Sequence, residues 1–505
     1  MLSVFASFSF LCVFCVSHLG LNVTYPQMDA AVNPKGQPPA EPVEQALYEI
    51  RKRIYPRAVS GNFATARWLC VWLTQLVFYG TPWLSWSGRQ AVLFDLGARK
   101  FYILGLVFWP QDIVYLTVLL IVCAYSLFLF TAVAGRLWCG YACPQTVYTE
   151  IFMWIERKVE GDRLARMKLD KGPLSGRRLR LKAIKHGLWI ALALWTGFTF
   201  VGYFTPIKTL GHEVLSFGLG PWETFWIGFY GFATYGNAGW MREQVCKYMC
   251  PYARFQSVMF DPDTLIITYD GERGEPRGAR NRSVDPKAKG LGDCVDCGIC
   301  VQVCPTGIDI RNGLQYECIG CAACVDGCDQ VMDKMGYPKG LIRYSTENAL
   351  KGHYSADRIV KRVLRPRVLV YTAILWVIII AAAVTLYHRV PLKVDVIRDR
   401  GNVMHDAEEA EVENVYRLQI MNTQEVEREI TIAVSGLDGI RLEGQAQHLR
   451  IPATSAKVVP VRVEAPRQSG QKGSNRIRFT VEALAPSRPT EAPIVVNEKA
   501  TFVIN

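Results

Sequence analysis

Residues 292–329 read GDCVDCGICVQVCPTGIDIRNGLQYECIGCAACVDGCD and hold eight of the chain's 16 cysteines. The spacing C-x2-C-x2-C-x3-C occurs twice in this stretch, followed once by proline and once by Asp329. In bacterial ferredoxins this spacing binds [4Fe–4S] clusters, and the fourth cysteine of each run binds the cluster of the other run. The first predicted cluster therefore has the ligands Cys294, Cys297, Cys300 and Cys328. The second has the ligands Cys318, Cys321, Cys324 and Cys304.

Zinc is the main alternative occupant of such cysteines. Structural zinc sites combine pairs of C-x2-C, however, and not triplets with a fourth cysteine. Gly298, Gly320 and Ala322 are small where backbone N–H groups must approach the cluster sulfurs. Two neighbouring clusters conduct single electrons, so the chain needs an electron donor and an electron acceptor.

A second cysteine pattern, C-x3-C-P, occurs at residues 139–144 and again at residues 246–251. Residues four apart share a helix face, so each pair is expected to point both sulfurs at one ligand. The proline that follows disfavours continued helix at the cysteine before it. The basic neighbours Arg136, Arg242 and Lys247 are expected to favour the thiolate. Thiolates suit Cu(I), zinc or an iron–sulfur cluster. The predicted redox or metal residues are Cys139, Cys143, Cys246 and Cys250. A core position is expected for Cys12, Cys15, Cys70 and Cys123.

Five segments have the length and apolar character of membrane spans, which need about 20 residues. They cover roughly residues 68–86, 113–134, 186–204, 221–240 and 368–387. Residues 1–19 are also apolar, but no basic residue precedes them as in a signal peptide. They are a further span, a poor signal peptide, or residues upstream of a start at Met28.

The formal charge of +12 reflects membrane topology more than nucleic-acid binding. Residues 157–185 alone carry eleven Lys and Arg against three Asp and Glu. Such an excess is typical of cytoplasmic loops. If five spans alternate, all the strongly basic stretches fall on the cytoplasmic side. This arrangement places residues 241–365 in the cytoplasm and residues 390–505 outside it.

The C-terminal part changes to the alternating pattern of β-strands, as in YRLQIMN (416–422) and NRIRFTVEAL (475–484). Such strands, separated by turn residues, indicate an immunoglobulin-like sandwich. The predicted fold is thus a multi-domain membrane protein with an α-helical transmembrane bundle of about five spans. An α+β dicluster ferredoxin is inserted into it, and an all-β immunoglobulin-like sandwich follows. The expected boundaries are 1–60 for the N-terminal segment, 61–260 for the first spans, 261–365 for the ferredoxin domain, 366–390 for the last span and 391–505 for the outer domain.

Five stretches carry a resemblance to a known family: RLWCGYACPQTV (136–147), NAGWMREQVCKYMCPYARFQ (237–256), LGDCVDC (291–297), CPTGIDIR (304–311) and YECIGCAAC (316–324). They resemble the cytochrome c oxidase accessory protein family CcoG, also called FixG or RdxA. The order of spans, dicluster ferredoxin, last span and outer domain is similar too. The resemblance covers roughly residues 48–505.

The resemblance implies a cupric reductase of the bacterial inner membrane that helps to assemble cbb(3)-type cytochrome c oxidase. Cu(I) prefers sulfur, whereas Cu(II) prefers nitrogen and oxygen, so an assembly route built on thiolates needs the reduced ion. Carried onto this chain, the resemblance makes the four C-x3-C-P cysteines candidates for copper contact or electron handover. The expected partners are the membrane, oxidase subunits or copper-delivery proteins, an unidentified electron donor and, as one option, a second copy of the chain.

Two other functions remain open from the sequence. One is a quinol-linked electron relay, because the layout of motifs also resembles quinol dehydrogenases of the NapH and NosR type. The other is a non-catalytic assembly scaffold that docks through its outer domain. The resemblance over the outer domain favours the cupric reductase over the relay, because this domain is the part that distinguishes the two families. Whether the four C-x3-C-P cysteines bind copper, bind a third cluster or form disulfides is also left open.

Overall fold

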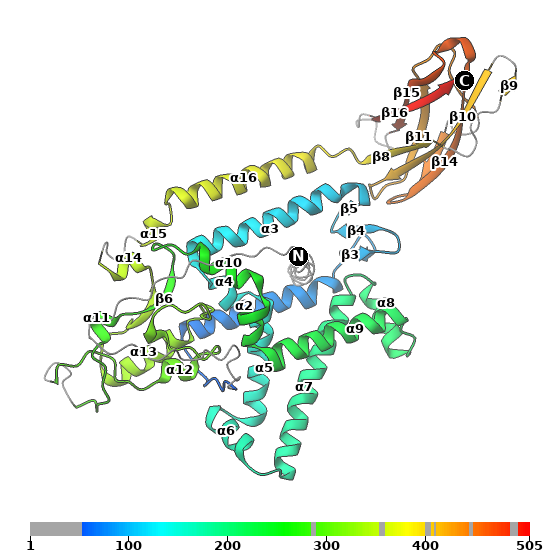
Figure 1. The fold of residues 1–505 in the computed structure, drawn as a ribbon. Helices are drawn as coiled ribbons and strands as arrows, with labels where there is room; N and C mark the ends of the chain where they lie inside the picture. The colour runs from blue at the N-terminus through cyan, green and yellow to red at the C-terminus, as the bar shows by residue number, and fades with distance from the viewer. Residues whose placement is uncertain are drawn as a thin grey trace, which may run out of the picture. The chain divides into compact units, whose positions relative to one another are not determined.

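A computed structural model describes residues 53–283, 289–352, 359–398, 406–408, 411–443, 448–484 and 493–504. The apolar residues 1–19, with Cys12 and Cys15, lie outside this described part. The chain divides into two compact units (Figure 1). Unit 1 comprises Met1–Thr81, Cys123–Val201 and Gly211–Leu375. Unit 2 comprises Pro82–Val122, Gly202–Leu210 and Trp376–Asn505.

Three helices in the described part are long and apolar enough to cross a membrane. They cover Pro110–Ala134, which includes α3 (Ile113–Ala134), then α7 (Gly176–Val201) and α16 (Pro366–Tyr387). These helices correspond to the second, third and fifth segments expected from the sequence. Within unit 1, α7 packs against α9 (Pro221–Thr234) and α5 (Pro144–Glu160).

The other two expected spans form shorter or less apolar helices. The first is α2 (Asn62–Gly80), which ends two residues before Pro82. The fourth is α9, whose 14 residues continue into the π-helix η3 (Tyr235–Met241). Both helices expose large apolar side chains, including Leu76 on α2 and Phe232 on α9. The structure therefore supports three spans by length and composition, and five remains a proposal.

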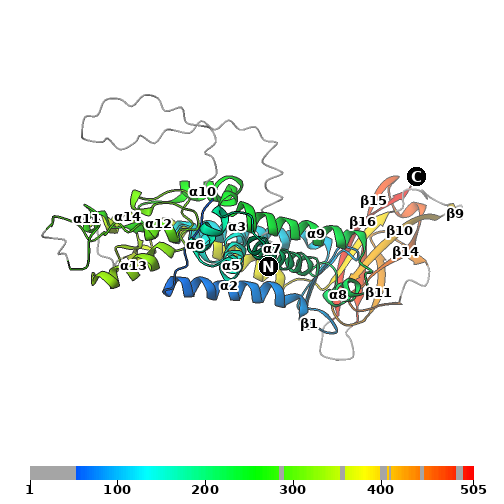
Figure 2. The same cartoon turned by 90° about the horizontal axis from the view of Figure 1, so that it is seen from below.

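The ferredoxin part of unit 1 is closed by a two-stranded antiparallel sheet. Strand β6 (Ile266–Tyr269) precedes the cysteine loops and pairs with β7 (Ile342–Ser345), which follows them. Between these strands, α12 (Ile299–Val303) packs against α13 (Ala323–Met335), as Figure 2 shows. Ala322 and Val325 are buried with Ile267 and Ile342 in the core beneath the two loops.

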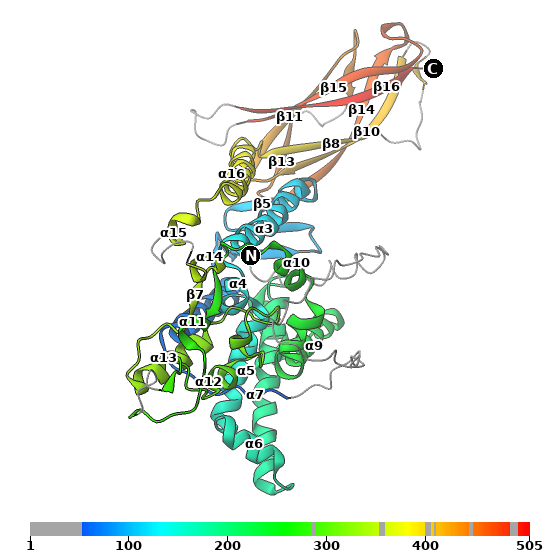
Figure 3. The same ribbon diagram turned by 60° about the vertical axis from the view of Figure 1, so that its left-hand side comes forward.

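The C-terminal part of unit 2 is a sandwich of two antiparallel sheets, and its long strands can be followed in Figure 3. One sheet has the order β12 (Arg441–Glu443), β14 (Ala456–Pro466), β10 (Glu411–Asn422) and β8 (Leu392–Arg398), with β9 (Asp406–Glu408) also paired to β10. The other has the order β13 (His448–Ile451), β11 (Arg428–Ser435), β15 (Gly473–Ala483) and β16 (Ile494–Ile504). Tyr416, Phe479 and Phe502 are fully buried between them. This arrangement confirms the sandwich predicted from the alternating pattern.

A small sheet that the sequence did not predict lies beside the sandwich in unit 2. It consists of β3 (Val92–Asp95), β4 (Lys100–Ile103) and β5 (Leu106–Phe108). Met421 of the sandwich packs against Val107 of β5 and against Trp109, the residue directly after β5. The carboxylate of Asp112 accepts a hydrogen bond of 2.6 Å from Arg389 and is also paired with Lys393.

The remaining elements are short. They are η1 (Thr81–Trp83), β1 (Ser85–Trp86), β2 (Arg89–Gln90), η2 (Pro110–Asp112), α4 (Leu137–Tyr141), α6 (Arg163–Lys171), α8 (Ile207–Leu215), η4 (Val245–Met249), α10 (Pro251–Met259), α11 (Gly271–Gly274), η6 (Ile310–Asn312), α14 (Glu347–Leu350), α15 (Ile359–Arg362) and η9 (Arg467–Ser469).

Candidate metal centres

The two C-x2-C-x2-C loops follow the same backbone course. Asp296 and Gly298 of the first loop have φ angles of 51° and 64°, and Gly320 and Ala322 of the second have 68° and 56°. Positive φ values that alternate with negative ones turn successive N–H groups into one concavity, a geometry that recurs at Fe–S sites. Gly298 and Ala322 then start α12 and α13. The small residues noted in the sequence thus occupy left-handed positions that favour glycine.

The structure groups the eight ferredoxin cysteines into two sets. Cys328 lies within electrostatic reach of Cys294, Cys297 and Cys300. Cys304 lies within reach of Cys318, Cys321 and Cys324. These are the sets that the crossed ligand pattern predicts.

A cavity between the cysteines of the second set fits a cubane cluster. It measures about 330 Å³ with its open side included and is lined by all four thiols together with the apolar side chains of Ile267, Ile308 and Ile310. Iron–sulfur clusters are held by four thiolates in just such a donor set, and their potentials depend on burial. The residues present therefore fit a [4Fe–4S] cluster at this position.

Each C-x3-C-P pair is divided between two helices, which corrects the expectation that both sulfurs share one helix face. Cys139 lies in α4, whereas Cys143 is the N-cap of α5 with ψ at 128°. Cys246 lies in the π-helix η4, whereas Cys250 is the N-cap of α10 with ψ at 108°. The proline disfavours the α conformation at the preceding cysteine, so one helix ends and another begins there. The second cysteine of each pair is consequently placed at a helix N-terminus, where the dipole favours negative charge.

The two C-x3-C-P motifs meet although about a hundred residues separate them. Cys246 interacts electrostatically with Cys139, Cys143 and Cys250, and Cys143 interacts with Cys250. Among the described residues, no three His, Cys, Asp or Glu side chains converge tightly enough to bind one metal ion. We call Cys139, Cys143, Cys246 and Cys250 the thiol cluster.

The thiol cluster lies directly against the second ferredoxin loop. Cys139 and Cys246 pack against a buried apolar cluster that contains Cys321, and Cys324 packs against the same cluster. Two glycines make the close approach: a Cβ on Gly140 would lie 2.8 Å from Cα of Cys321, and a Cβ on Gly320 would lie 3.1 Å from the carbonyl of Arg136. Only backbone without side chains can approach this closely.

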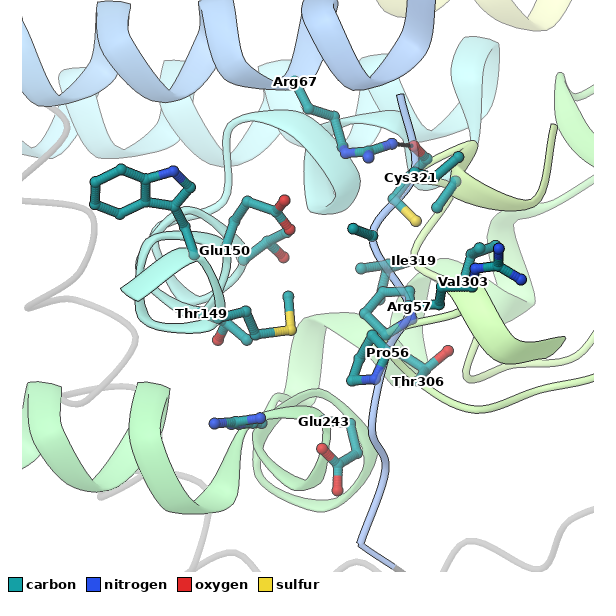
Figure 4. A pocket seen from close by; sticks show the side chains of 18 of the residues that line it. Pro56, Arg57, Arg67, Thr149, Glu150, Glu243, Val303, Thr306, Ile319 and Cys321 are labelled. Atoms are coloured by element: carbon teal, nitrogen blue, oxygen red, sulfur yellow. Dashed lines mark hydrogen bonds between the residues drawn. The ribbon is translucent and has the colours of Figure 1, made fainter. Parts of the chain in front are cut away.

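Two arginines fasten the same loop to the helices. Arg67 of α2 donates a hydrogen bond to the carbonyl oxygen of Cys321, shown by the dashed line in Figure 4. Arg136 donates to the carbonyl oxygens of Tyr316 and Ala253, and so links the loop to α10. Both side chains are buried, and both donate to main-chain carbonyl oxygens of the segments that hold the cysteines.

The expected thiolate character is not supported for three of these thiols, because burial outweighs the basic neighbours. Burial raises the pKa of Cys139 to about 12 and that of Cys143 to about 11, and it also raises the pKa of Cys246. Arg242 is paired with Glu156 at 3.0 Å, and Lys247 with Glu317 at 3.4 Å. Cys139, Cys143 and Cys246 are therefore protonated unless a metal is bound, since coordination deprotonates a thiol.

Sequence reasoning missed Glu156 of α5, which is surrounded by cations. Its carboxylate lies 3.0 Å from Arg166, 3.0 Å from Arg242, 3.4 Å from Arg53 and 3.7 Å from Lys185. Because Cys143 starts α5 and Arg242 precedes Cys246, this carboxylate joins the two halves of the thiol cluster. No role was assigned to Glu156 from the sequence, because no motif marks it and its four cations come from separate segments.

A cavity of about 970 Å³, measured with its open mouth, lies on the other side of Cys321. In Figure 4, Cys321 and Glu150 face it from opposite sides, and Glu243 lies below. Trp68 and Trp154 contribute aromatic surface, and Cys246 of the thiol cluster also reaches the wall. The cavity therefore adjoins the second ferredoxin loop and the thiol cluster together.

Three family profiles match the chain. The profile "4Fe-4S dicluster domain" matches residues 241–347, and "4Fe-4S binding domain" matches residues 116–160. The profile of the "IG-like fold at C-terminal of FixG" matches residues 382–505. These matches confirm the dicluster ferredoxin and the immunoglobulin-like domain.

Curated relatives cover most of the chain. Nitrogen fixation protein FixG of Rhizobium meliloti is 36% identical over 88% of this chain and 92% of its own length. Protein RdxA of Cereibacter sphaeroides is 37% identical over 85% of this chain and 92% of its own. Ferredoxin-type protein NapH of Haemophilus influenzae is 23% identical over 41% of this chain and 64% of its own. From the first two relatives and the matching C-terminal profile it follows that the chain belongs to the FixG/RdxA family of iron–sulfur electron-transfer proteins.

Proposed function

We propose that this protein is an oxidoreductase that reduces Cu(II) to Cu(I) for the assembly of a cbb(3)-type cytochrome c oxidase. The observation that carries the proposal is the packing of Cys139 and Cys246 against the buried cluster that contains Cys321 of the second ferredoxin loop. This packing places groups suited to a soft metal beside a loop suited to an iron–sulfur cluster. Copper is the substrate in this account and not a resident cofactor.

The chemistry of copper fits such a site. Each Cu(II) ion takes up one electron, and [4Fe–4S] clusters exchange electrons singly. The cluster ligands would be the two sets of four ferredoxin cysteines described above. The Cu(I) product prefers sulfur, whereas Cu(II) prefers nitrogen and oxygen. The four thiols therefore serve either as a copper contact or as the point of electron handover.

We further propose that five spans cross the bacterial inner membrane. The exposed apolar side chains of α2 and α9 support adding these helices to the three long ones. The basic stretches would then lie in the cytoplasm with the ferredoxin part, and the sandwich would lie in the periplasm. There it would dock on oxidase subunits or copper-delivery proteins, and dimerisation through this domain is an option.

The test is reduction of Cu(II) by the protein purified without oxygen and reduced beforehand, in the presence of a chromophoric chelator specific for Cu(I). Wild type is compared with Cys250→Ser and Cys297→Ser, and Cys123→Ser on α3 is the control. Rapid Cu(I) formation that Cys250→Ser loses while the cluster absorption persists would support the proposal. If only Cys297→Ser loses it, copper meets the ferredoxin part directly. A wild-type rate no greater than that of free thiols would exclude the reductase function.

A second candidate is a quinol-linked electron relay. The cavity beside Cys321 supports it, because Trp68 and Trp154 offer a stacking surface and Glu150 offers a proton acceptor. The partial similarity to NapH points in the same direction. Reduction of the clusters by a short-chain quinol, abolished by Trp154→Ala, would favour this function. The two candidates are compatible if a quinol supplies the electrons that copper receives.

A further inference from the structure

The thiol cluster has several features in common with the ferredoxin cysteine sets. It contains four cysteines, it draws them from two chain segments, and all four are partly buried. The "4Fe-4S binding domain" match at residues 116–160 includes Cys139 and Cys143, only half of a ligand set. The structure supplies the other half, Cys246 and Cys250, from a segment beyond that match.

Helix N-termini lie at cysteines in both places. Cys143 and Cys250 are the N-caps of α5 and α10. In the ferredoxin part, Cys300 and Cys324 lie in the first turn of α12 and α13. The unpaired N–H groups of a helix N-terminus favour a negative charge, such as that of a metal-bound thiolate.

Arg136 provides a buried positive charge between the thiol cluster and the second ferredoxin loop. Its side chain is within electrostatic reach of Cys139, Cys246 and Cys318. Its Nη groups are occupied by main-chain carbonyls, but its Nε is buried and has no hydrogen-bond partner among the described residues. A buried donor without a partner is costly, and an anionic group bound beside it would satisfy it. A cluster with four thiolate ligands is such a group.

We propose that Cys139, Cys143, Cys246 and Cys250 together hold a third [4Fe–4S] cluster. A cubane distributes its thiolates over four irons, so four cysteines that do not converge on one metal ion can still hold one cluster. The further role of this cluster, electron handover from the second ferredoxin cluster to copper, rests on the proposed function; the cluster itself does not. Such a handover would move one electron: the second cluster would lose it and the third cluster would gain it.

The test is the iron and acid-labile sulfide content of the full chain, purified without oxygen in detergent. Three clusters predict about 12 iron and about 12 sulfide per chain, and two predict about 8 of each, from the four-iron stoichiometry. Cys139→Ser and Cys250→Ser should each lower both contents to about 8, whereas Cys123→Ser should leave them unchanged. A reductive titration should fall from about three electrons per chain to about two in the same variants.

The outcomes separate the proposals. A variant that fails to fold would lose all its iron, so the ferredoxin clusters must remain visible by electron paramagnetic resonance in Cys139→Ser for that variant to count. Wild-type protein with about 8 iron, unchanged by Cys139→Ser, would overturn the third cluster, as would copper bound to these thiols in place of iron. About 12 iron without any Cu(II) reduction would instead retain the cluster and refute the copper function.

Discussion

Glu156 exposes 1% of its side chain and is surrounded by two arginines and a lysine that are also buried. Taking a carboxylate out of water is unfavourable unless cations and hydrogen bonds replace the lost hydration. Here the replacement comes from Arg166 and Arg242 at 3.0 Å each. Because Arg242 belongs to the segment that leads to Cys246, this single carboxylate helps to position a cysteine motif far away in the sequence.

Replacing Glu156 with glutamine should destabilise unit 1 strongly, because it leaves buried cations without a counter-charge. The expected cost is about 3–5 kcal/mol of folding free energy. It would be measured as a lower midpoint of thermal unfolding in detergent. Glu347→Gln is the matched control, since Glu347 also forms an ion pair, at 2.5 Å with Lys351, but with half of its side chain exposed. That change should cost less than about 1 kcal/mol, and equal effects of the two substitutions would contradict the account.

The contribution of Glu156 should depend on pH in a defined direction. Burial raises the pKa of this carboxyl, but Arg242, Arg166 and Lys185 together lower it more, so that the pKa lies below its ordinary range. Such a group stabilises the fold above the unfolded-state pKa of about 4.3, and the effect is lost as the pH falls through the lower folded-state pKa. The difference in thermal midpoint between wild type and Glu156→Gln should thus stay constant from about pH 7 to about pH 5 and shrink only below about pH 4.3. A difference that disappears between pH 8 and pH 6 would rule this explanation out.

At the scale of elements, the site depends on short helices that begin and end at the cysteines. α4 ends before Cys143, and η4 ends before Cys250. Each following proline starts a new helix, α5 or α10, in a new direction. The close contact of α4 with the second ferredoxin loop then brings the thiol cluster next to Cys321.

Gly140→Ala should separate α4 from this loop. The added Cβ would meet the backbone of Cys321 and Gly320 at 2.8–2.9 Å, and backbone atoms cannot move aside as a flexible side chain can. A displacement of about 1 Å can slow a reaction by about a hundredfold, so Cu(II) reduction should slow by about tenfold to a hundredfold. Gly228→Ala on α9 is the control, because nothing lies within 4 Å of its added Cβ. An unchanged rate in Gly140→Ala, with the α4 contact intact, would show that electrons do not pass at this contact.

The sequence predicted those elements that a pattern within one short stretch of the chain marks. The ferredoxin loops follow from cysteine spacing, because consecutive ligands of one loop bind one cluster. The sandwich follows from strict alternation, as in β15, where Ile477, Phe479 and Val481 are buried in turn. The prediction that both cysteines of a C-x3-C-P motif share one helix face was wrong. It gave the four-residue spacing more weight than the proline, which separates the two cysteines by a helix boundary. The cation set of Glu156 could not be predicted, because Arg53, Arg166, Lys185 and Arg242 come from four separate segments.

At the scale of the whole molecule, three helices have the length and apolar character to cross a membrane. The proposed addition of α2 and α9 would make the number of spans odd when counted from Asn62. In that proposal the ferredoxin part would lie in the cytoplasm and the sandwich outside it. The three-stranded sheet between α2 and α3 would then share the side of the sandwich, in agreement with the packing of Val107 and Trp109 on Met421.

Reporter fusions test this topology. Alkaline phosphatase, which folds only where disulfides form, should be active when fused after residue 505 and inactive when fused after residue 352. A fusion within the basic stretch 157–185 should also be inactive and serves as the cytoplasmic control. Activity at residue 352 would place the ferredoxin part outside the cytoplasm and contradict the positive-inside assignment.

The most direct test of the central claim is a single-turnover experiment without any added reductant. The protein is reduced, freed of excess reductant and mixed rapidly with Cu(II) and a Cu(I)-specific chelator, while cluster absorption and Cu(I) formation are followed together. The account predicts that the clusters are reoxidised at the rate at which Cu(I) appears, with one Cu(I) for each electron lost, and that Cys250→Ser uncouples the two signals. Clusters that stay reduced in the presence of Cu(II), with no Cu(I) formed, would contradict it.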